Sequence, residues 1–276
     1  MKKLVQLPVW SDNYVYVLEN DDVTGGAVVV VDPCEAAPVL AWLEHAGRAL
    51  DAVLCTHHHP DHVGGNLELH ERTGCTVVGP ERDRDRIPGL TRGVDVGAVF
   101  DVGGLGFRVL DVAAHTRGHI AFAFDERIDV VVRHGHAGLA SVVAHLAQRP
   151  ALFVGDSLFG AGCGRLFEGS AEDLHRSLST LAAEDDDALV CCAHEYTAAN
   201  LAFAVSVAPH IAAVVARRDG LQQEMGKARS SVPSILGVEK QTNPFLLALH
   251  QQIGPQTGDV VARIFDLRRQ KDSFRA

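Results

Sequence analysis

The most constraining feature of this chain is a run of four histidines and one aspartate, Thr56–His62, which directly follows the apolar stretch Ala52–Cys55. Histidine is the commonest metal ligand in proteins. His57 and His59 are two positions apart on a loop, so their side chains can converge on one ion, while the aspartate and last histidine follow on a tight turn and can serve a second ion. A catalytic site for two ions needs more donors than one loop supplies. The run therefore predicts further ligands from later loops.

Three later segments carry suitable donors, and each lies at or just after the end of an apolar, β-branched run that predicts a strand. These segments are Ala114–His119, Gly155–Asp156 and Ala193–Glu195. Loops on a rigid sheet are where proteins tend to present reactive groups. We therefore expect these segments to join the histidine run at one site.

The hydrophobic pattern is that of an α/β protein up to about Tyr196, because short apolar runs alternate with amphipathic helical patterns. The predicted strands are Tyr14–Leu18, Ala27–Val31, Ala52–Cys55, Thr76–Val78, Phe107–Val112, Ile120–Phe124, Ala151–Val154 and Ala188–Cys191. The predicted helices are Pro38–Ala46, Gly65–Glu71 and Ala171–Leu181. Beyond Tyr196 the pattern predicts helices over Ala198–Val207 and Ile211–Met225 and no further clear strand, and hence a small helical C-terminal domain.

Residues Asp129–Arg149 are interpreted as an insertion with helical character at its end. The insertion contains three rival metal ligands, His134, His136 and His145. A histidine pair in a polar loop usually faces water, so we favour the histidine run over this alternative. The segment Gly103–Gly106 is interpreted as a turn between strands, since no lysine or helix start follows to make it a phosphate loop.

Composition limits the partners and the compartment. The net charge of −10 disfavours nucleic acid as a partner, and the N-terminus lacks an apolar run long enough for a signal peptide or a membrane span. The six cysteines contain no C-x-x-C pair, so a disulfide framework is not indicated and a cytoplasmic location is expected. The basic end Arg263–Arg275 is either an anion-binding patch or a solvated face.

Four motifs together resemble the metallo-β-lactamase fold superfamily in residue type, order and spacing. They are T-H-x-H-x-D-H at Thr56, H-T-x-G-H at His115, Gly155-Asp156 and the late His194. More specific segments are similar to glyoxalase II, the hydroxyacylglutathione hydrolases, nearly from end to end. These are Asp12–Tyr14, Gly155–Phe159, Gly162–Arg165, His194–Thr197, Asn200-Leu201, Thr242–Phe245 and Arg268–Asp272.

The resemblance implies a fold and a division of the chain. The expected fold is an α/β, metallo-β-lactamase-like αββα sandwich with a smaller helical C-terminal domain. The catalytic domain would span residues 1–195, and residues 196–276 would form the helical domain that contributes to glutathione binding.

The resemblance also implies a metal-ligand set for two divalent ions. One ion would be held by His57, His59 and His115 and the other by Asp61, His62 and His194, with Asp156 as a bridge and with Asp61 and Asp156 as the catalytic carboxylates. His58 and His119 would pack or form hydrogen bonds instead. Asp32 matches an acidic position that orients ligands in the family, and the alternative is a turn aspartate before Pro33.

The implied reaction is hydrolysis of the thioester S-D-lactoylglutathione to D-lactate and glutathione, the second step of methylglyoxal detoxification, by a monomer. A water shared by two divalent ions loses a proton near neutral pH and can attack the thioester carbonyl. Zinc is the favoured metal, while iron and manganese suit the same ligands.

The expected substrate-binding residues are those that match the family's glutathione-binding positions. They are Arg165, Phe167, Tyr196, Arg268 and Lys271. Arg165 stands where lysine is common, Phe167 where a tyrosine can occur, and Leu247 where an arginine is frequent. We expect the missing hydroxyl of Phe167 to weaken substrate binding by about 1 kcal/mol.

Other reactions are less favoured by the sequence. A glutathione persulfide dioxygenase or another hydrolase of the same fold is the alternative, but the dioxygenase uses one iron with two histidines and one aspartate, whereas seven ligand positions are intact here. Gly155–Leu158 also spells a serine-hydrolase motif with Ser157 as nucleophile, yet no D-x-x-H follows near the C-terminus to supply its base.

Overall fold

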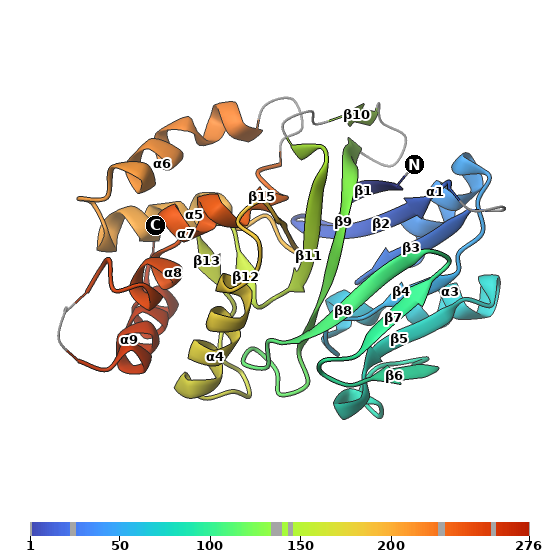
Figure 1. Cartoon of the computed structure of the whole chain (residues 1–276), viewed down its shortest axis with the longest axis horizontal. Helices are drawn as coiled ribbons and strands as arrows, with labels where there is room; N and C mark the ends of the chain where they lie inside the picture. Colours follow the sequence, from blue (N-terminus) through green and yellow to red (C-terminus); the bar gives the residue numbers. More distant parts are fainter. Residues whose placement is uncertain are drawn as a thin grey trace.

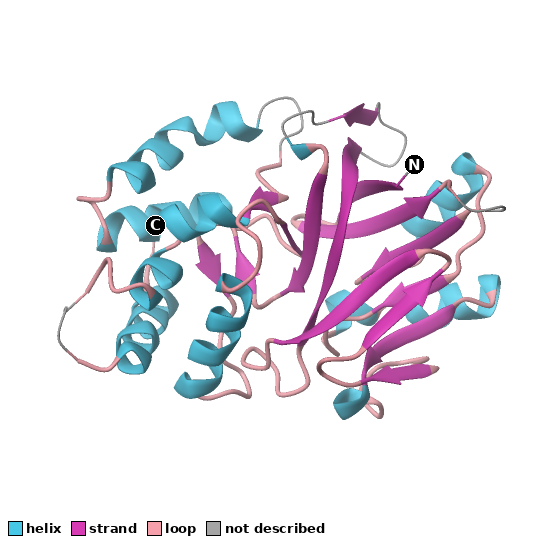
Figure 2. Ribbon diagram, viewed as in Figure 1, coloured by secondary structure: helices cyan, strands magenta, loops and turns pink. Residues whose placement is uncertain are grey.

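Two β-sheets packed face to face form the centre of the computed structural model, which describes residues 2–22, 26–133, 140–142, 146–225, 230–254 and 258–275 (Figures 1 and 2). The first sheet has the order β1-β2-β3-β4-β5-β6 and the second the order β15-β14-β11-β9-β8-β7. The strands of the first are β1 (Lys2–Val9), β2 (Asn13–Asn20), β3 (Ala27–Val31), β4 (Ala52–Leu54), β5 (Thr76–Pro80) and β6 (Arg92–Val94). The other strands are β7 (Val99–Val102), β8 (Leu105–Asp111), β9 (Ile120–Arg133), β10 (Ala140–Val142), β11 (Arg149–Gly155), β12 (Leu158–Phe159), β13 (Gly162–Cys163), β14 (Leu189–Cys192) and β15 (Ser234–Ile235).

The long strand β9 belongs to both sheets. Its first half pairs antiparallel with β8 and β11, where Phe122 lies opposite Phe153. Its second half pairs parallel with β1, where Val130 lies opposite Leu4. One strand of 14 residues therefore joins the two sheets covalently.

Alternate side chains of the strands enter two different apolar clusters. In β2, Tyr14, Tyr16 and Leu18 face the space between the sheets, whereas Val15 and Val17 face the helices on the outer side of the first sheet. Both faces of the strand are buried, which explains its nearly continuous apolar sequence. This pattern is the one expected for a sandwich with helices outside.

The outer layers are formed by helices of the first two-thirds of the chain. They are α1 (Ala37–Ala46), α2 (Pro60–Val63), α3 (Asn66–Thr73) and α4 (Ala171–Ala182), with a 3₁₀ turn at Glu81–Asp83. α1 and α3 cover the first sheet, and α4 packs on the second (Figure 1). A capping box formed by Ser170 and Asp173 begins α4. The predicted αββα sandwich is confirmed.

The C-terminal part of the chain is helical, as predicted (Figure 2). Its helices are α5 (Thr197–Val207), α6 (Ala212–Met225), α7 (Leu236–Thr242), α8 (Pro244–Leu249) and α9 (Val260–Ser273). Asn243 and Asp259 cap α8 and α9 by accepting hydrogen bonds from Phe245 N and Val261 N. The boundary at residues 195 and 196 stays a prediction.

Several details differ from the sequence-based expectations. The expectation of no strand after Tyr196 was wrong, since β15 pairs antiparallel with β14. The helical character expected at the end of the insertion falls mainly outside the described residues, and Leu146, which is described, has 3₁₀ conformation. Residues Asp129–Arg133 continue β9, Ala140–Val142 pair with it as β10, and Arg149 begins β11. The run of valines that ends β9 favours a strand.

The three rival histidines of the insertion lie outside the described residues. The segment that begins at Gly103 is a tight turn, as predicted. Gly103 and Gly104 connect β7 to β8 with φ of 56° and 81°, the left-handed conformation that a two-residue hairpin turn requires. Within the described residues, no helix has both the length and the apolar composition needed to span a bilayer.

A core substitution tests the packing of the two sheets. The fully buried ring of Phe153 in β11 meets Tyr16 of β2 edge to face, with ring centroids 5.8 Å apart. Phe153→Ala should lower the free energy of unfolding by about 3–5 kcal/mol, because it leaves a cavity between the sheets. Chemical denaturation in a metal-containing buffer measures this change. Val99→Ala is the control, since Val99 is 74% exposed, and its effect should stay within about 0.5 kcal/mol.

Candidate metal centre and adjoining pocket

The histidines and carboxylates singled out in the sequence meet at one edge of the two sheets. His57 and His59 follow β4, and His115 follows β8. Asp156 comes directly after β11, and His194 comes two residues after β14. Four separate loops, each anchored by a buried strand, therefore supply one cluster.

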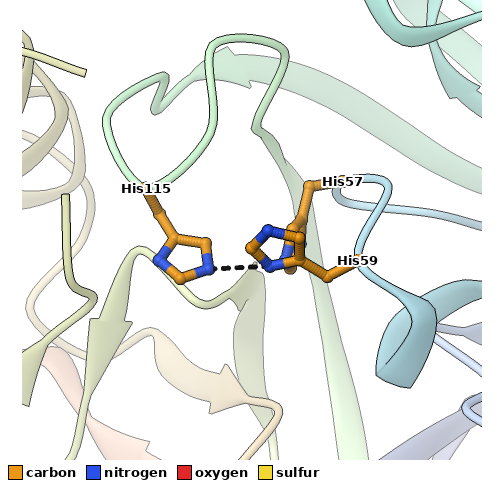
Figure 3. Close-up of side chains that lie close together, drawn as sticks. All are labelled: His57, His59 and His115. Carbon is orange, nitrogen blue, oxygen red and sulfur yellow. Dashed lines mark hydrogen bonds between the residues drawn. The ribbon is translucent and has the colours of Figure 1, made fainter. Parts of the chain in front are cut away.

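Three imidazoles form one lobe of this cluster. Figure 3 shows His57 and His59 on one loop and His115 on the opposite loop, with their rings turned toward one another. His57 Nε2 lies 3.1 Å from His59 Nδ1, and His115 Nε2 lies 3.0 Å from the same nitrogen. Three nitrogens from three side chains thus converge on one point.

A carboxylate and two imidazoles form the second lobe. They are Asp61, His62 and His194, whose donor atoms also lie within 4.8 Å of one another. His194 Nε2 is 3.3 Å from Asp61 Oδ2, and His62 Nε2 is 3.7 Å from the same oxygen. This lobe offers one oxygen and two nitrogens.

Asp156 stands between the two lobes. Its Oδ1 lies 3.4 Å from the Nε2 atoms of His62 and of His194, and its Oδ2 lies 3.5 Å from His115 Nε2. Among the described residues, His62 Nε2 and Asp156 Oδ1 are buried polar atoms without a hydrogen-bond partner. Buried groups of this kind are normally satisfied. The arrangement fits a divalent cation in each lobe, with the carboxylate shared.

The electrostatics differ between the two lobes. Burial lowers the pKa of His57 well below its ordinary value, and burial and neighbouring imidazoles lower the pKa of His59 to about 4. Burial opposes ionisation of Asp61, but the hydrogen bond from His194 and the attraction of His62 and His194 together outweigh it and lower the pKa of Asp61 to about 2. At neutral pH the first lobe therefore presents neutral imidazoles. The second presents a carboxylate, and although burial opposes protonation, the neighbouring carboxylates raise the pKa of His62 and of His194.

Asp32 fixes the orientation of two of these histidines. Its Oδ1 accepts from Thr56 N at 2.8 Å, and its Oδ2 accepts from Thr56 Oγ1 at 2.7 Å and lies 3.1 Å from His62 Nδ1. Thr56 Oγ1 in turn lies 3.0 Å from His57 Nδ1. A carboxylate that holds the far nitrogen of a ligating histidine fixes its tautomer and ring orientation. The structure thus places Asp32 where the sequence analysis expected it.

The other two orienting groups were not identified from the sequence. His115 Nδ1 donates to the main-chain carbonyl of Arg165 at 2.8 Å, and His194 Nδ1 lies 2.9 Å from Asp12 Oδ1. Asp12 lies in the Asp12–Tyr14 segment noted in the sequence, but the sequence did not indicate that its carboxylate contacts His194. The Arg165 carbonyl has no sequence signal, because every residue carries one.

The two remaining histidines of the motifs lie outside both lobes. His119 accepts from Asp156 N at 3.1 Å and stacks on His57, with ring centroids 4.4 Å apart. His58 points away and interacts with Asp83 and Arg86. These positions agree with the non-ligand roles expected from the sequence.

Two glycines allow the loops to approach so closely. Gly155 has a φ of 48°, and a Cβ there would lie 2.3 Å from Thr56 Oγ1. A Cβ on Gly164 would lie 2.0 Å from Asp156 O and 3.1 Å from His115 Nδ1. Any side chain at these positions would push the loops apart, so glycine is required here.

Two adjoining pockets open beside the cluster. The first has a volume of about 310 Å³ and is lined by His59, Pro60, Asp61, His115, Asp156, Phe167, His194 and Tyr196. The second has a volume of about 210 Å³ and is lined by Phe159, Cys163, Arg165, Tyr196, Ala199, Asn200, Arg268, Lys271, Phe274 and Arg275. Tyr196 lines both pockets and stacks on His194, with centroids 4.8 Å apart. A cationic pocket therefore borders the metal centre.

The cationic side chains of the second pocket differ in their exposure and in their hydrogen bonds. Arg268 is 4% exposed and donates to Cys163 O at 2.6 Å and to Asp272 Oδ1 at 3.1 Å. Lys271 Nζ donates to Ala199 O at 3.0 Å, and burial lowers its pKa. The side chain of Arg165 is 63% exposed, so it is the most accessible of the three cations predicted from the sequence.

Comparisons with known proteins identify the family. The model of the metallo-beta-lactamase superfamily matches residues 9–194, and that of the hydroxyacylglutathione hydrolase C-terminus matches residues 195–274. Hydroxyacylglutathione hydrolase of Methylococcus capsulatus is 44% identical over 279 residues, covering 100% of both chains. That of Ruegeria pomeroyi is 43% identical over 277 residues, covering 99% of both. The chain belongs to the hydroxyacylglutathione hydrolase family.

Solved structures support the fold of this hydroxyacylglutathione hydrolase family member. ETHE1 from Myxococcus xanthus has a TM-score of 0.60 at 23% identity, covering 97% of this chain and 99% of the other. The BLEG-1 B3 metallo-beta-lactamase has a TM-score of 0.58 at 20% identity, covering 89% and 99%. Family membership and the convergent histidines and carboxylates make this a divalent-metal site.

The structure places two positions that depart from the family pattern, Phe167 and Leu247, and the serine of the rival serine-hydrolase interpretation. Phe167 is 63% exposed and lies at the mouth of the metal pocket, with its ring centroid 5.6 Å from His59 and 5.1 Å from His115. Leu247 is fully buried in the core around α8, so it does not face the substrate pocket. Ser157 is buried and donates to Val154 O at 2.7 Å, which leaves it unsuited as a nucleophile.

An isosteric substitution tests the orienting role of Asp32. Asp32→Asn places an amide where a carboxylate oxygen now accepts, so it disturbs either Thr56 or His62. We expect the affinity for zinc to fall by about 10–100-fold, measured by competition with a chromogenic chelator. Asp51→Asn is the control, because Asp51 also accepts a main-chain hydrogen bond, from Val28 N, but lies outside the cluster. Unchanged zinc affinity in the Asp32 variant would contradict the role.

Proposed function

We propose that this protein hydrolyses S-D-lactoylglutathione, or a close 2-hydroxyacyl analogue, to the 2-hydroxy acid and glutathione. The main support for the proposal is that the two pockets adjoin, since Tyr196 lines both of them. One holds the metal-binding cluster, the other holds four cationic side chains, and Tyr196 belongs to both. A thioester whose glutathione part is anionic can therefore lie in the cationic pocket with its acyl group over the metal centre.

The proposed metal content is two divalent ions, most suitably zinc, with iron or manganese compatible with the same donors. His57, His59 and His115 would hold one ion, and Asp61, His62 and His194 the other. The two oxygens of Asp156 point to different lobes, which supports its role as the bridge. When bound, such ions supply a nucleophile at neutral pH and polarise the substrate carbonyl.

Polar groups around the two lobes would keep the donor atoms in place during the reaction. Asp32, Asp12 and the Arg165 carbonyl engage the far nitrogens of His62, His194 and His115.

The attacking oxygen bonds to the thioester carbon, the carbon–sulfur bond then breaks, and the leaving thiolate takes up a proton to give glutathione. A thiolate leaves readily, so no side chain has to act as a strong general acid.

The glutathione part requires partners for its carboxylates, and arginine and lysine provide them. The exposed guanidinium of Arg165 and the ammonium of Lys271 suit this role. Arg268 lines the same pocket, but it is only 4% exposed and donates to Cys163 and Asp272, whereas the exposed Arg165 has one ion pair, with Asp272 at 3.4 Å. Tyr196 would contact the substrate between the two sites.

We further propose that the protein acts as a monomer in the cytoplasm. The six cysteines are all buried and free, which suits a reducing compartment. The substrate pocket is assembled from one chain, so no second copy is needed to complete it.

The deciding experiment measures hydrolysis of S-D-lactoylglutathione by the purified protein and the metal content of the same sample. We expect loss of the thioester absorbance with about two divalent ions per chain. A metal-loaded protein without turnover would contradict the proposed substrate. One iron per chain with oxygen uptake on glutathione persulfide would instead favour the dioxygenase.

A pair of substitutions separates metal binding from substrate binding. Asp156→Ala should lower the metal content and abolish nearly all turnover, because it removes the shared oxygens. Arg165→Ala keeps the main-chain carbonyl that orients His115 and should raise KM about 10-fold or more, as expected for a lost charge-assisted hydrogen bond, at full metal content. Steady-state kinetics and elemental analysis measure both. Equal metal loss in the two variants would contradict this division of roles.

Phe167→Tyr tests the effect of the missing hydroxyl. The ring is exposed at the pocket mouth, so an added hydroxyl fits and can donate a hydrogen bond to the substrate. We expect KM to fall about five-fold, which corresponds to roughly 1 kcal/mol, with kcat little changed. Phe265→Tyr in α9 is the control, since Phe265 lines neither pocket, and its KM should stay unchanged.

A further inference from the structure

The backbone of the β12–β13 hairpin, Leu158–Cys163, is hydrogen-bonded from Phe159 to Cys163 by side chains of the helical C-terminal part. Four side chains form these hydrogen bonds, and each is at most 5% exposed. They are Asn243 (to Phe159 O, 3.2 Å, and Gly162 O, 2.9 Å), Asn200 (to Gly160 O, 3.0 Å), Glu239 (from Ala161 N, 2.8 Å) and Arg268 (to Cys163 O, 2.6 Å). Every residue from Phe159 to Cys163 is therefore fixed by at least one such bond.

The two ends of the same hairpin lie at the metal centre. Asp156, which stands between the two lobes, precedes the hairpin, and Arg165, whose carbonyl holds His115, follows it. Gly164 N donates to Ser157 O at 3.4 Å and closes the base. Any movement of the hairpin would therefore shift a metal-binding carboxylate on one side and a histidine-orienting carbonyl on the other.

The hairpin has little structure of its own to keep it in place. Each strand has two residues, which is too short for independent stability. Its tip residue Ala161 has a φ of 51°, a conformation that L-residues rarely adopt unless the surroundings impose it. The hydrogen bonds from the helices supply that constraint.

The acceptor at the tip is itself part of a buried ion pair. Glu239 is fully buried and lies 2.9 Å from Arg217 of α6, and Arg217 donates to Thr242 Oγ1 at 2.7 Å. Breaking a buried pair of this kind by removing one partner is strongly destabilising. A pair that ties together α6, α7 and the hairpin tip thus stiffens the contact between the helices and the site.

We propose that the C-terminal helices position the metal centre through this hairpin, with Asn243 as the central positioning residue. Asn243 contacts neither lobe of the cluster, yet its amide nitrogen bonds both strands of the hairpin. Only the kinetic part of the test below rests on the proposed function. The proposal assigns to the helices a role in metal affinity, in addition to their share of the glutathione pocket.

The test uses a substitution that separates two roles of Asn243. Its side-chain oxygen caps α8 by accepting from Phe245 N at 3.1 Å, whereas its nitrogen holds the hairpin. Asn243→Ser keeps an oxygen suited to the cap and removes the amide donors. The control is Asp259→Ala, which removes the cap of α9 without touching the hairpin. Both variants are studied as the full metal-loaded chain, well below their melting temperatures.

We expect Asn243→Ser to weaken zinc binding about 10-fold or more, measured by chelator competition. It should also lower kcat and raise KM for S-D-lactoylglutathione, whereas Asp259→Ala should lower only the melting temperature. A lowered melting temperature with wild-type zinc affinity and kinetics in Asn243→Ser would overturn the proposal. Should that variant not fold, Asn200→Ala removes the donor to Gly160 alone and must shift zinc affinity in the same direction.

The zinc measurement does not involve the thioester. A wild-type protein that binds zinc but fails to hydrolyse the substrate would therefore contradict the proposed function and leave this test valid. Conversely, an active wild-type protein with unchanged zinc affinity in both Asn243→Ser and Asn200→Ala would refute the positioning role alone.

Discussion

The carboxylate of Asp156, buried among imidazoles, is the constraint on which the site depends. A buried carboxylate is costly unless opposite charge and hydrogen bonds compensate it. Burial would raise its pKa, but the neighbouring His62 and His194 hold the pKa of Asp156 well below its usual range. The anion is therefore retained in the interior, where it attracts cations to both sides.

Many features of the surrounding chain serve this one group. Gly155 removes the side chain that would collide with Thr56. His119 accepts from the main-chain nitrogen of Asp156 and thereby fixes the turn after β11. The following hairpin is held from the side of the helices, so the carboxylate is constrained before and after its position in the chain.

The sequence predicted the ligand loops because they combine rare residue types with strong flanking strands. Ala52–Leu54 and Leu189–Cys192 are short and apolar, and both formed strands where expected. β1 was missed, since two lysines and Pro8 obscure the alternation of Lys2–Val9. The chain positions of the histidines and carboxylates that meet at the site could thus be predicted.

The sequence could not predict the interactions made by backbone groups or by polar residues that are distant in the chain. The carbonyl of Arg165 orients His115 only because the fold brings the two together. The bonds of Asn243 and Glu239 to the hairpin depend on a tertiary arrangement that no periodicity encodes. The helical region was predicted, but its apolar residues share a continuous core with the sheets, so its packing could not be inferred from the helices alone.

The length of strand β9 separates the metal centre from a part of the chain that can change in length. The strand begins next to His119 at the metal centre, and with 14 residues it spans roughly 45 Å before the chain turns back through β10. The end of β9, strand β10 and the start of β11 therefore lie at the opposite end of the sheets from the ligand loops. That end can be lengthened, shortened or fused to another polypeptide, while the reacting groups keep their spacing.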